Sequence, residues 1–506
     1  MLKACSLIAV LCGIAFRAAA FSPALQQLTA TSRRRTALAA SSGKGFGKPA
    51  GAGGSGAGAS SSFQRDEALD QLLSWSDDNG IVRGKGISVA ANSKNVGGGV
   101  GIRINRPGKA GDEVMSIPRN VVVSSQDALS SLTTEEVDIV TNTLKSDGLD
   151  TYASEFFLML RLLQEVAAYK GRADRQGGGT LGPWLDSLPT EFDMGIYFDD
   201  LERSYLPQLA SKLLDLQERQ LAAFRKACDA LADHDGKHAT LFETDDDSKC
   251  AADGDTVKWA FSIVFSRSWR SPSNSEDARM VPLADNFNHG EEANVIVEEP
   301  EGDSGVTRVV LKNDDVERGT ELKLSYGPGY DPSRFLIIFG FFDETVREVF
   351  CGVAFTDPSE ELVRLGASDR SSMIYRDDGA ISNAVWDSTL YVTLAQKPDE
   401  QRAFYEARIN DDAELFQALH RKYRLEIALS LKNHAEAVLQ TEYLVPTDQE
   451  LSKINVKEHP QLPMILKHNR FMRKVFGNVK DRLEKQVLLE VEKRRAEVKD
   501  EVEKGA

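Results

Sequence analysis

The spacing of apolar residues changes along the chain, and each change marks a different kind of element. Leucines three and four residues apart between 66 and 75 predict a short amphipathic helix. Between 87 and 123, valines and isoleucines stand in short segments separated by glycine and proline, which is typical of small strands. Residues 124–232 return to the three- and four-residue spacing, with charged residues on the opposite face, and therefore predict a set of helices.

The second half of the chain repeats this succession. An acidic stretch at 233–255 predicts an exposed loop, after which strand-like segments return between 281 and 355. Beyond Pro358 the spacing is helical again to the end of the chain. Two sets of short strands that must meet across a long helical insertion predict an α+β fold rather than a parallel α/β fold.

The amino-terminal segment has the composition of a targeting signal. Residues 1–20 combine Lys3, an apolar run at 7–16 and three alanines, which is the pattern of a secretory signal peptide. The run is too short to cross a bilayer, which takes about 20 helical residues. Residues 21–62 lack acidic residues and are typical of a transit peptide followed by a Gly/Ser-rich flexible linker. The two signals together resemble a bipartite plastid leader, so we expect a plastid protein, with a secreted protein as the alternative, and a folded chain that begins near Phe63.

The charge of the chain excludes one large class of partner. The formal net charge of the 506 residues is −16, but residues 1–64 hold seven basic residues and no acidic one, so the remainder carries −23. A body this acidic has no general electrostatic affinity for phosphate backbones. We therefore expect no nucleic acid as the main partner. We also expect no membrane association once the leader is removed.

The cysteines exclude two kinds of structural site. Cys5 and Cys12 lie in the leader, and the other three, Cys228, Cys250 and Cys351, are far apart in the sequence. Disulfide frameworks and zinc sites need even or closely spaced sets of cysteines. We therefore expect neither in this protein, which is predicted to work in a thiol-permissive compartment.

Four short segments carry the candidate chemistry. They are a glycine turn at 97–103, an apolar helix at 259–267, a polar turn at 285–290, and a strand end at 322–328 with the aromatic run 334–342 after it. The glycine turn lacks the preceding strand and following helix that a dinucleotide-binding turn needs. Taken one at a time, each segment also has a purely structural interpretation.

These structural interpretations differ from segment to segment. Arg267 can satisfy the carbonyl groups at the end of its own helix. Asp285 and His289, four residues apart, would share one helix face as metal ligands do, but the third ligand of a catalytic zinc site is not evident, and a polar turn that faces a pocket fits better. Tyr326 stands at a strand end, where it is either a core aromatic residue or a hydroxyl directed into a cleft.

The order and spacing of the four segments together resemble the SET-domain protein methyltransferases. The subclass they resemble includes the plastid Rubisco large-subunit lysine methyltransferase and the actin-histidine methyltransferase. Residues 182–189 and 197–200 resemble the inserted helical subdomain of that subclass. The resemblance implies a SET domain of short strands at 63–345 with a helical insertion at about 124–256, followed by an all-α domain at 346–506 that resembles the Rubisco-substrate-binding domain.

The resemblance also implies an activity. It implies an S-adenosylmethionine-dependent protein-lysine N-methyltransferase that acts as a monomer, without a metal, on a plastid protein such as the Rubisco large subunit or aldolase. Two alternatives stay open, which are a protein-histidine N-methyltransferase and a non-catalytic binding scaffold with the same fold.

The residues that would perform this activity follow from the same resemblance. Tyr326 matches the active-site tyrosine, which orients the acceptor nitrogen, and Arg103 would lie near the methionyl carboxylate of the cofactor. The residues that would bind S-adenosylmethionine are Gly99, Gly101, Arg103, Arg267, Asp285, Asn288, His289, Phe339 and Phe341.

The sequence departs from the family pattern at three places. Gly290 replaces the serine that follows the Asn-His pair, and residues 331–334 replace a Ser-Asn pair after the tyrosine. Phe339 stands where the plant Rubisco enzyme has a tyrosine, which removes a hydroxyl near the pocket. This last change leaves the number of methyl groups transferred, and the acceptor residue, open.

Overall fold

The computed structural model describes residues 57–91, 100–170, 181–242, 254–271, 274–299, 305–327, 331–353 and 358–504. The predicted signal peptide, most of the predicted transit peptide and linker, and Gly99 lie outside these residues. Within them, no helix is both long and apolar enough to span a membrane.

Small sheets form the centre of the first part of the chain. One sheet has the order β1 (Val82–Arg83), β4 (Glu113–Pro118), β10 (Val306–Leu311) and β9 (Val295–Glu298). A second has the order β2 (Ile87–Ala91), β3 (Val100–Ile104), β11 (Glu321–Leu324) and β8 (Asn288–His289). A third has the order β5 (Val123–Ser124), β7 (Ala278–Met280) and β6 (Trp269–Arg270). Each sheet joins strands from before and after the helical insertion, so the α+β prediction is confirmed.

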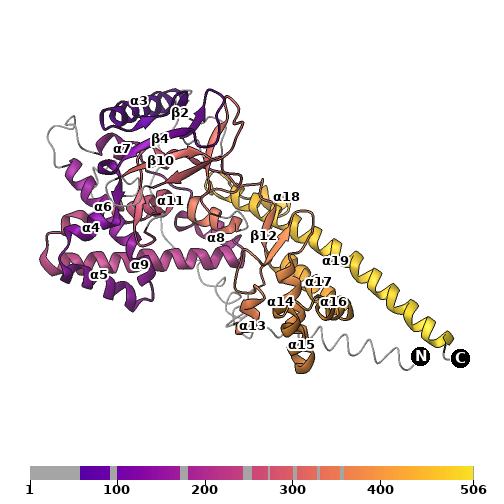
Figure 1. Ribbon diagram of the computed structural model, residues 1–506. Helices are drawn as coiled ribbons and strands as arrows, with labels where there is room; N and C mark the ends of the chain where they lie inside the picture. Colours follow the sequence, from indigo (N-terminus) through magenta and orange to yellow (C-terminus); the bar gives the residue numbers. More distant parts are fainter. Residues whose placement is uncertain are drawn as a thin grey trace.

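Helices pack around these sheets. Figure 1 shows α3 on one side of the strands and the long α9 on the other. The α-helices of this part are α3 (Ala57–Asp78), α4 (Ser125–Ser131), α5 (Thr134–Ser146), α6 (Ala153–Lys170), α7 (Gly182–Ser187), α8 (Asp200–Ser204), α9 (Gln208–Asp235), α10 (Ala239–Phe242), α11 (Thr256–Arg267) and α12 (Pro332–Arg334). Single turns of 3-10 helix are η1 (Arg119–Val121), η2 (Asp150–Tyr152), η3 (Gly195–Tyr197) and η4 (Ala284–Asn286), and η5 (Phe335–Phe339) is a π-helix.

The rest of the chain is mostly helical. It contains β12 (Glu348–Phe350), α13 (Glu360–Arg364), β13 (Ile374–Arg376), α14 (Asn383–Thr393), the 3-10 turn η6 (Leu394–Gln396), α15 (Pro398–Ile409), α16 (Ala413–Lys422), α17 (Arg424–Thr441), α18 (Asp448–Leu451) and α19 (Leu462–Lys504). In Figure 1, α19 begins beside the first part of the chain and runs diagonally to the carboxyl terminus.

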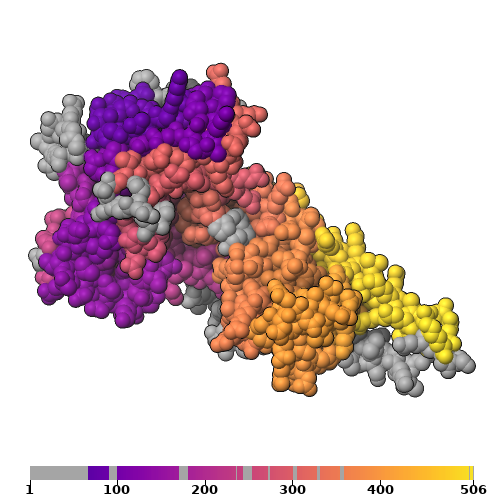
Figure 2. Space-filling model, viewed as in Figure 1, coloured from indigo at the N-terminus to yellow at the C-terminus, as the bar shows by residue number. Residues whose placement is uncertain are grey.

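Two separate hydrophobic cores divide the described chain into two units. The core of the first unit runs from Leu72 to Ile337, and that of the second unit, the C-terminal unit, runs from Val346 to Leu483. Figure 2 shows the C-terminal unit in orange and yellow beside the first unit. Ile465, on α19, belongs to the core of the first unit, so the start of this helix is shared between the two.

The structure differs from the sequence predictions at several boundaries. Helix α3 begins at Ala57, inside the segment predicted as a flexible linker, because each residue added to the end of a formed helix gains a backbone hydrogen bond without a new nucleation step. Strand β13 interrupts the predicted all-α domain by pairing with β12. The predicted exposed loop at 233–255 is partly helical, because α9 continues to Asp235 and α10 follows it.

Glu136 shows how the insertion is held together. Its carboxylate is buried, forms a capping box with Thr133 at the start of α5, lies 3.0 Å from His238 Nε2, and pairs with Lys237. Burial alone would raise the pKa of this carboxyl, but the hydrogen bonds from Lys237, Thr133 and His238 lower it from 4.5 to about 2. The ionised form of Glu136 therefore stabilises the folded state.

A Glu136→Gln variant is expected to unfold more easily at pH 7, by about 2 kcal/mol. Because the pKa is lower in the folded state, the difference from the wild type is complete above pH 4.5 and shrinks as the pH falls toward about 2. Urea unfolding at several pH values measures this difference. The matched control is Glu135→Gln, since the Glu135 side chain is 75% exposed, and a difference that does not change between pH 5 and 3 would contradict the prediction.

Candidate active site

Five aromatic side chains from between residues 289 and 341 gather beside β8 and β11. They form the aromatic cluster, which consists of His289, Tyr326, Phe335, Phe339 and Phe341. The ring centroids of His289 and Phe335 are 4.4 Å apart, those of Tyr326 and Phe339 are 5.1 Å apart, and those of Phe335 and Phe341 are 5.3 Å apart. The cluster presents aromatic faces, which attract cations as well as apolar groups.

The local backbone explains why these rings meet. Strands β8 and β11 pair in parallel, with His289 opposite Leu324, so that Tyr326 follows two residues beyond the paired end. The π-helix η5 then carries Phe335 and Phe339, and Gly340 ends it with a left-handed backbone conformation. Single turns of π-helix are rare and occur often at functional sites.

Tyr326 is fixed at both its backbone and its hydroxyl. The Tyr326 N–H donates to His289 Nδ1 at 3.1 Å, and the Tyr326 hydroxyl donates to the Phe287 carbonyl oxygen at 2.5 Å. Burial raises the pKa of Tyr326 to about 12, so the hydroxyl keeps its proton at neutral pH. With this proton committed to Phe287, the lone pairs of the phenol oxygen remain as acceptors.

His289 contributes a donor to the same space. Because its Nδ1 accepts from the Tyr326 amide, the neutral ring carries its proton on Nε2. Burial lowers the pKa of His289, which favours the neutral form. Its Nε2 is buried and has no hydrogen-bond partner within the described part of the chain. A buried unsatisfied donor of this kind is costly, and a bound ligand is one way to satisfy it.

Arg267 is held in place by a buried carboxylate. Helix α11 ends at Arg267, whose Nη1 lies 3.1 Å from Asp285 Oδ2 and 3.2 Å from the Asp285 carbonyl oxygen. Trp184 Nε1 donates to the same Oδ2 at 3.2 Å, and Asn286 Nδ2 donates to Oδ1 at 3.1 Å. Asp285, predicted to bind the cofactor, thus uses both oxygens within the protein and orients Arg267 toward the site.

Asn288 joins the aromatic cluster to the strands that carry the predicted glycine turn. Its amide donates to Glu321 Oε1 at 2.8 Å and lies 3.5 Å from the Val100 carbonyl oxygen. Gly101 is buried on β3 next to this carbonyl. Arg103 lies further along the same strand, where its Nη1 donates to the Gly319 carbonyl oxygen at 3.2 Å.

The predicted site residues are thus brought together to different degrees. The structure gathers Arg267, Asp285, Asn288, His289, Tyr326, Phe339 and Phe341 in one region, with Gly101 beside it. The described hydrogen bond of Arg103 goes instead to the Gly319 carbonyl oxygen, in a different turn, and Gly99 lies outside the described residues.

The metal-ligand interpretation of Asp285 and His289 does not match the backbone. Asp285 lies in the 3-10 turn η4 and His289 on strand β8, so they share no helix face. Over the described ranges, no three His, Cys, Asp or Glu side chains come close enough to hold a metal ion.

Three contributors to the site were not predicted from the sequence. They are the ring of Phe335, the carbonyl of Phe287 and the indole of Trp184. Phe335 and Phe339 are four residues apart, which is a helical spacing and would have placed Phe335 with Phe339 if the segment had been treated as a helix. The Phe287 carbonyl, which accepts a hydrogen bond, and the Trp184 indole, which donates to a buried carboxylate, leave no such signal in the sequence.

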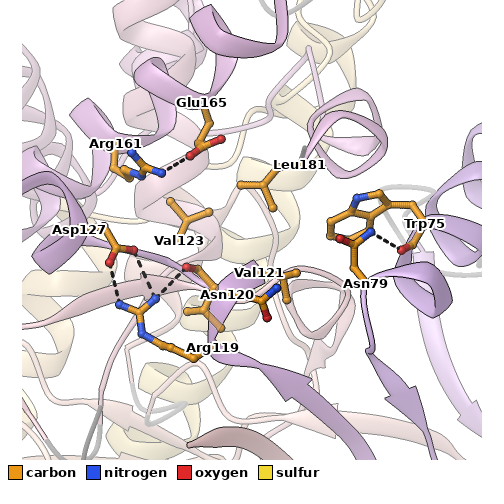
Figure 3. Close-up of a pocket in the computed structure, with 11 residues that line it drawn as sticks. Trp75, Asn79, Arg119, Asn120, Val121, Val123, Asp127, Arg161, Glu165 and Leu181 are labelled. Carbon is orange, nitrogen blue, oxygen red and sulfur yellow. Dashed lines mark hydrogen bonds and ion pairs between the residues drawn. The ribbon is translucent and has the colours of Figure 1, made fainter. Parts of the chain in front are cut away.

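A pocket of about 630 Å³ lies in another place, where residues 119–123 meet the end of α3, α4 and α6 (Figure 3). Two ion pairs line it, Arg119 with Asp127 and Arg161 with Glu165, and Trp75 is part of its wall. None of the predicted site residues borders this pocket. Its charged groups are already paired with each other, and it is separate from the aromatic cluster.

Comparison with known proteins identifies the fold. The sequence matches no protein-family model and has no significant match among curated proteins. The structure is similar to the SET domain of LSMT bound to lysine and AdoHcy, with a TM-score of 0.55, 15% identity, and coverage of 84% of this chain and 92% of that chain. It is also similar to Rubisco LSMT bound to sinefungin and monomethyllysine (TM-score 0.56, 15% identity, 84% and 93% coverage) and to Rubisco LSMT bound to AdoMet (TM-score 0.54, 15% identity, 84% and 93% coverage).

At this level of identity, the similarity shows the fold. The protein has the SET-domain fold with a helical insertion and a helical C-terminal region, in the arrangement of LSMT. The aromatic cluster and the Arg267–Asp285 pair lie within the first unit of that fold.

Proposed function

We propose that this protein is an S-adenosylmethionine-dependent protein-lysine N-methyltransferase. The observation that carries the proposal is the tyrosine hydroxyl of the aromatic cluster, which is fixed on the Phe287 carbonyl beside the unsatisfied donor of His289. The LSMT structures, which share this fold, are bound to AdoMet or AdoHcy and to lysine or monomethyllysine. That likeness supports the same cofactor and the same kind of acceptor here.

The residues of the site fit S-adenosylmethionine. His289 Nε2 is a buried donor without a described partner, and the aromatic faces beside it favour a positively charged sulfur centre. Arg267 and Asn288 supply a guanidinium and an amide next to them, with Asn288 close to the Val100 carbonyl. When bound, S-adenosylmethionine supplies an electrophilic methyl group on its sulfonium sulfur.

The protein itself has to deliver a neutral, aligned amine. A lysine side chain has a pKa of about 10.4 in water and is therefore protonated at neutral pH. Desolvation among the rings of the aromatic cluster favours its neutral form. The oxygen of Tyr326 then accepts a hydrogen bond from the amine and directs the nitrogen lone pair toward the methyl group. Since the pKa of Tyr326 is about 12, the residue orients the amine and does not act as its base.

Lysine is a better acceptor for this site than histidine. A methylated ammonium is attracted to aromatic faces, and Tyr326, Phe339 and Phe341 supply them. A histidine acceptor and a non-catalytic scaffold remain as outcomes of the test described below.

We further propose that the substrate is a plastid protein. The support is the composition of residues 1–62, which resembles a signal peptide followed by a transit peptide. The Rubisco large subunit is the first candidate, because LSMT structures with this fold are those of Rubisco LSMT, and plastid aldolase is the second.

The test is methyl transfer by the purified full-length protein. Radiolabelled S-adenosylmethionine and plastid extract are expected to give label in a protein band, and hydrolysis of that band is expected to release methyl-lysine. Release of methyl-histidine would show that the acceptor is histidine and not lysine. Cofactor binding without methyl transfer to any protein of the extract would favour the non-catalytic binding scaffold. Absence of cofactor binding by calorimetry at millimolar concentration would contradict the cofactor assignment.

A further inference from the structure

The aromatic segment, residues 333–342, is held from behind by the start of α19. This segment carries three rings of the aromatic cluster and ends at Phe342, which is buried. Phe342 lies against α19, with its ring centroid 5.6 Å from that of His468 and 5.2 Å from that of Phe471. The wall of the site therefore rests on the C-terminal unit.

A chain of buried hydrogen bonds makes the same connection. His468 Nε2 lies 3.2 Å from Ser333 Oγ, and His468 Nδ1 lies 3.1 Å from Asn469 Oδ1. All three residues are almost completely buried. Asn469 Nδ2 in turn donates to the carbonyl oxygens of Tyr205 at 2.8 Å and Leu444 at 2.9 Å.

These contacts fix the direction of every bond in the chain. Because Asn469 uses its Nδ2 as a donor to two carbonyls, its Oδ1 is an acceptor, and His468 Nδ1 must carry the proton. His468 Nε2 is then an acceptor, and the Ser333 hydroxyl donates to it. Each of these groups acts either as a donor or as an acceptor. Removing the imidazole therefore leaves the buried Ser333 hydroxyl without its acceptor and the buried Asn469 Oδ1 without its donor.

We propose that His468 is a positioning residue of the acceptor site. It holds the aromatic segment in place from the C-terminal unit, and it ties that segment to the insertion through the Tyr205 carbonyl. Binding of the protein substrate is therefore expected to depend on His468 more than binding of the cofactor does, because the aromatic segment forms the wall on which the acceptor side chain lies. This inference rests on the proposed methyltransferase function for the role of the acceptor site, whereas the hold of His468 on the aromatic segment does not depend on that function.

The experiment compares five variants of the full-length protein, which are four single variants and the double variant of His468→Leu with Ser333→Ala. His468→Leu removes both hydrogen bonds, His468→Gln keeps an acceptor for Ser333, and Ser333→Ala removes the donor. The matched control is His434→Leu, because His434 also forms a hydrogen bond through its Nε2, to the Cys351 carbonyl oxygen at 2.9 Å, but within the C-terminal unit.

The first readout is amide hydrogen exchange of the peptide that covers 335–342. His468→Leu is expected to increase its exchange rate about tenfold, because, of the two bonds that are lost, only the one to Ser333 reaches the aromatic segment, and His468→Gln is expected to restore most of the protection. Unchanged exchange in His468→Leu, or an equal increase in His434→Leu, would overturn the proposal. This readout does not require any enzymatic activity, so it remains decisive if the wild type transfers no methyl groups.

The second readout separates substrate binding from cofactor binding. His468→Leu and Ser333→Ala are each expected to raise the KM for the protein substrate by about tenfold and to change the ratio of mono- to multiply methylated product, while the Kd for S-adenosylmethionine changes less than about twofold. The double variant is expected to be no worse than His468→Leu, because both changes break the same bond. Equal losses in KM and in cofactor Kd would assign His468 a merely structural role.

Discussion

A Tyr326→Phe variant is expected to transfer methyl groups about a hundredfold more slowly than the wild type, with unchanged affinity for S-adenosylmethionine. The change removes only the hydroxyl, which donates to the Phe287 carbonyl at 2.5 Å and leaves the phenol oxygen as the acceptor for the substrate amine. The ring stays, so its contacts with Phe339 and Phe341 are kept. Single-turnover methyl transfer and calorimetry of cofactor binding measure the two quantities separately.

The chain offers a matched control for this change. Tyr375 is also buried, and its hydroxyl has no hydrogen-bond partner among the described residues. Tyr375→Phe therefore removes the same atom from a buried ring in the C-terminal unit and is expected to leave turnover within about twofold of the wild type. A Tyr326→Phe enzyme with the turnover of the control would remove Tyr326 from the catalytic machinery.

A Gly340→Ala variant is expected to lose both stability and activity. Gly340 has a φ of +69°, and a Cβ at this position would lie 2.5 Å from the carbonyl carbon of Asp193 and 2.6 Å from its oxygen. Backbone atoms cannot move aside cheaply, so the aromatic segment has to shift away from Asp193. We expect the free energy of unfolding to fall by about 3 kcal/mol and methyl transfer to fall at least about tenfold.

A Gly236→Ala variant is the control that distinguishes the strain of a left-handed backbone from the steric clash of the added Cβ. Gly236 caps α9 with a φ of +74°, and no atom lies within 4 Å of a Cβ built on it. Gly236→Ala is therefore expected to cost about 1 kcal/mol, from the left-handed conformation alone, with no change in methyl transfer. Denaturant unfolding of both variants gives the comparison, and equal losses would show that the contact with Asp193 is unimportant.

Much of the local structure is determined by the sequence alone. The helical spacing that ends at Arg267 predicted α11, and the strand-like residues between 281 and 355 include β10 at 306–311, because local sequence pattern reflects which side chains face a core. Tyr326 was predicted at a strand end, before the glycine that ends regular structure, and it lies two residues beyond the end of β11. The order of the four segments was sufficient to predict the SET-domain fold, although this chain is only 15% identical to the solved structure of LSMT with that fold.

Other features were decided only by tertiary structure. Asp285 was predicted to bind the cofactor, and the structure shows that both of its carboxylate oxygens accept hydrogen bonds within the protein. The donors are Arg267 and Trp184, from separate helices, and the neighbouring Asn286. The buried Leu283 adopts a φ of +70°, a conformation that a leucine reaches only when its surroundings impose it.

The same holds for the wall of the site. A pattern of aromatic residues does not distinguish a strand from a π-helix, and nothing near residue 333 in the sequence points to His468. Local periodicity determines which elements form, because it depends on neighbours in the chain. The site depends on which elements meet, and hydrogen bonds between residues more than a hundred positions apart are settled only when the two cores pack together.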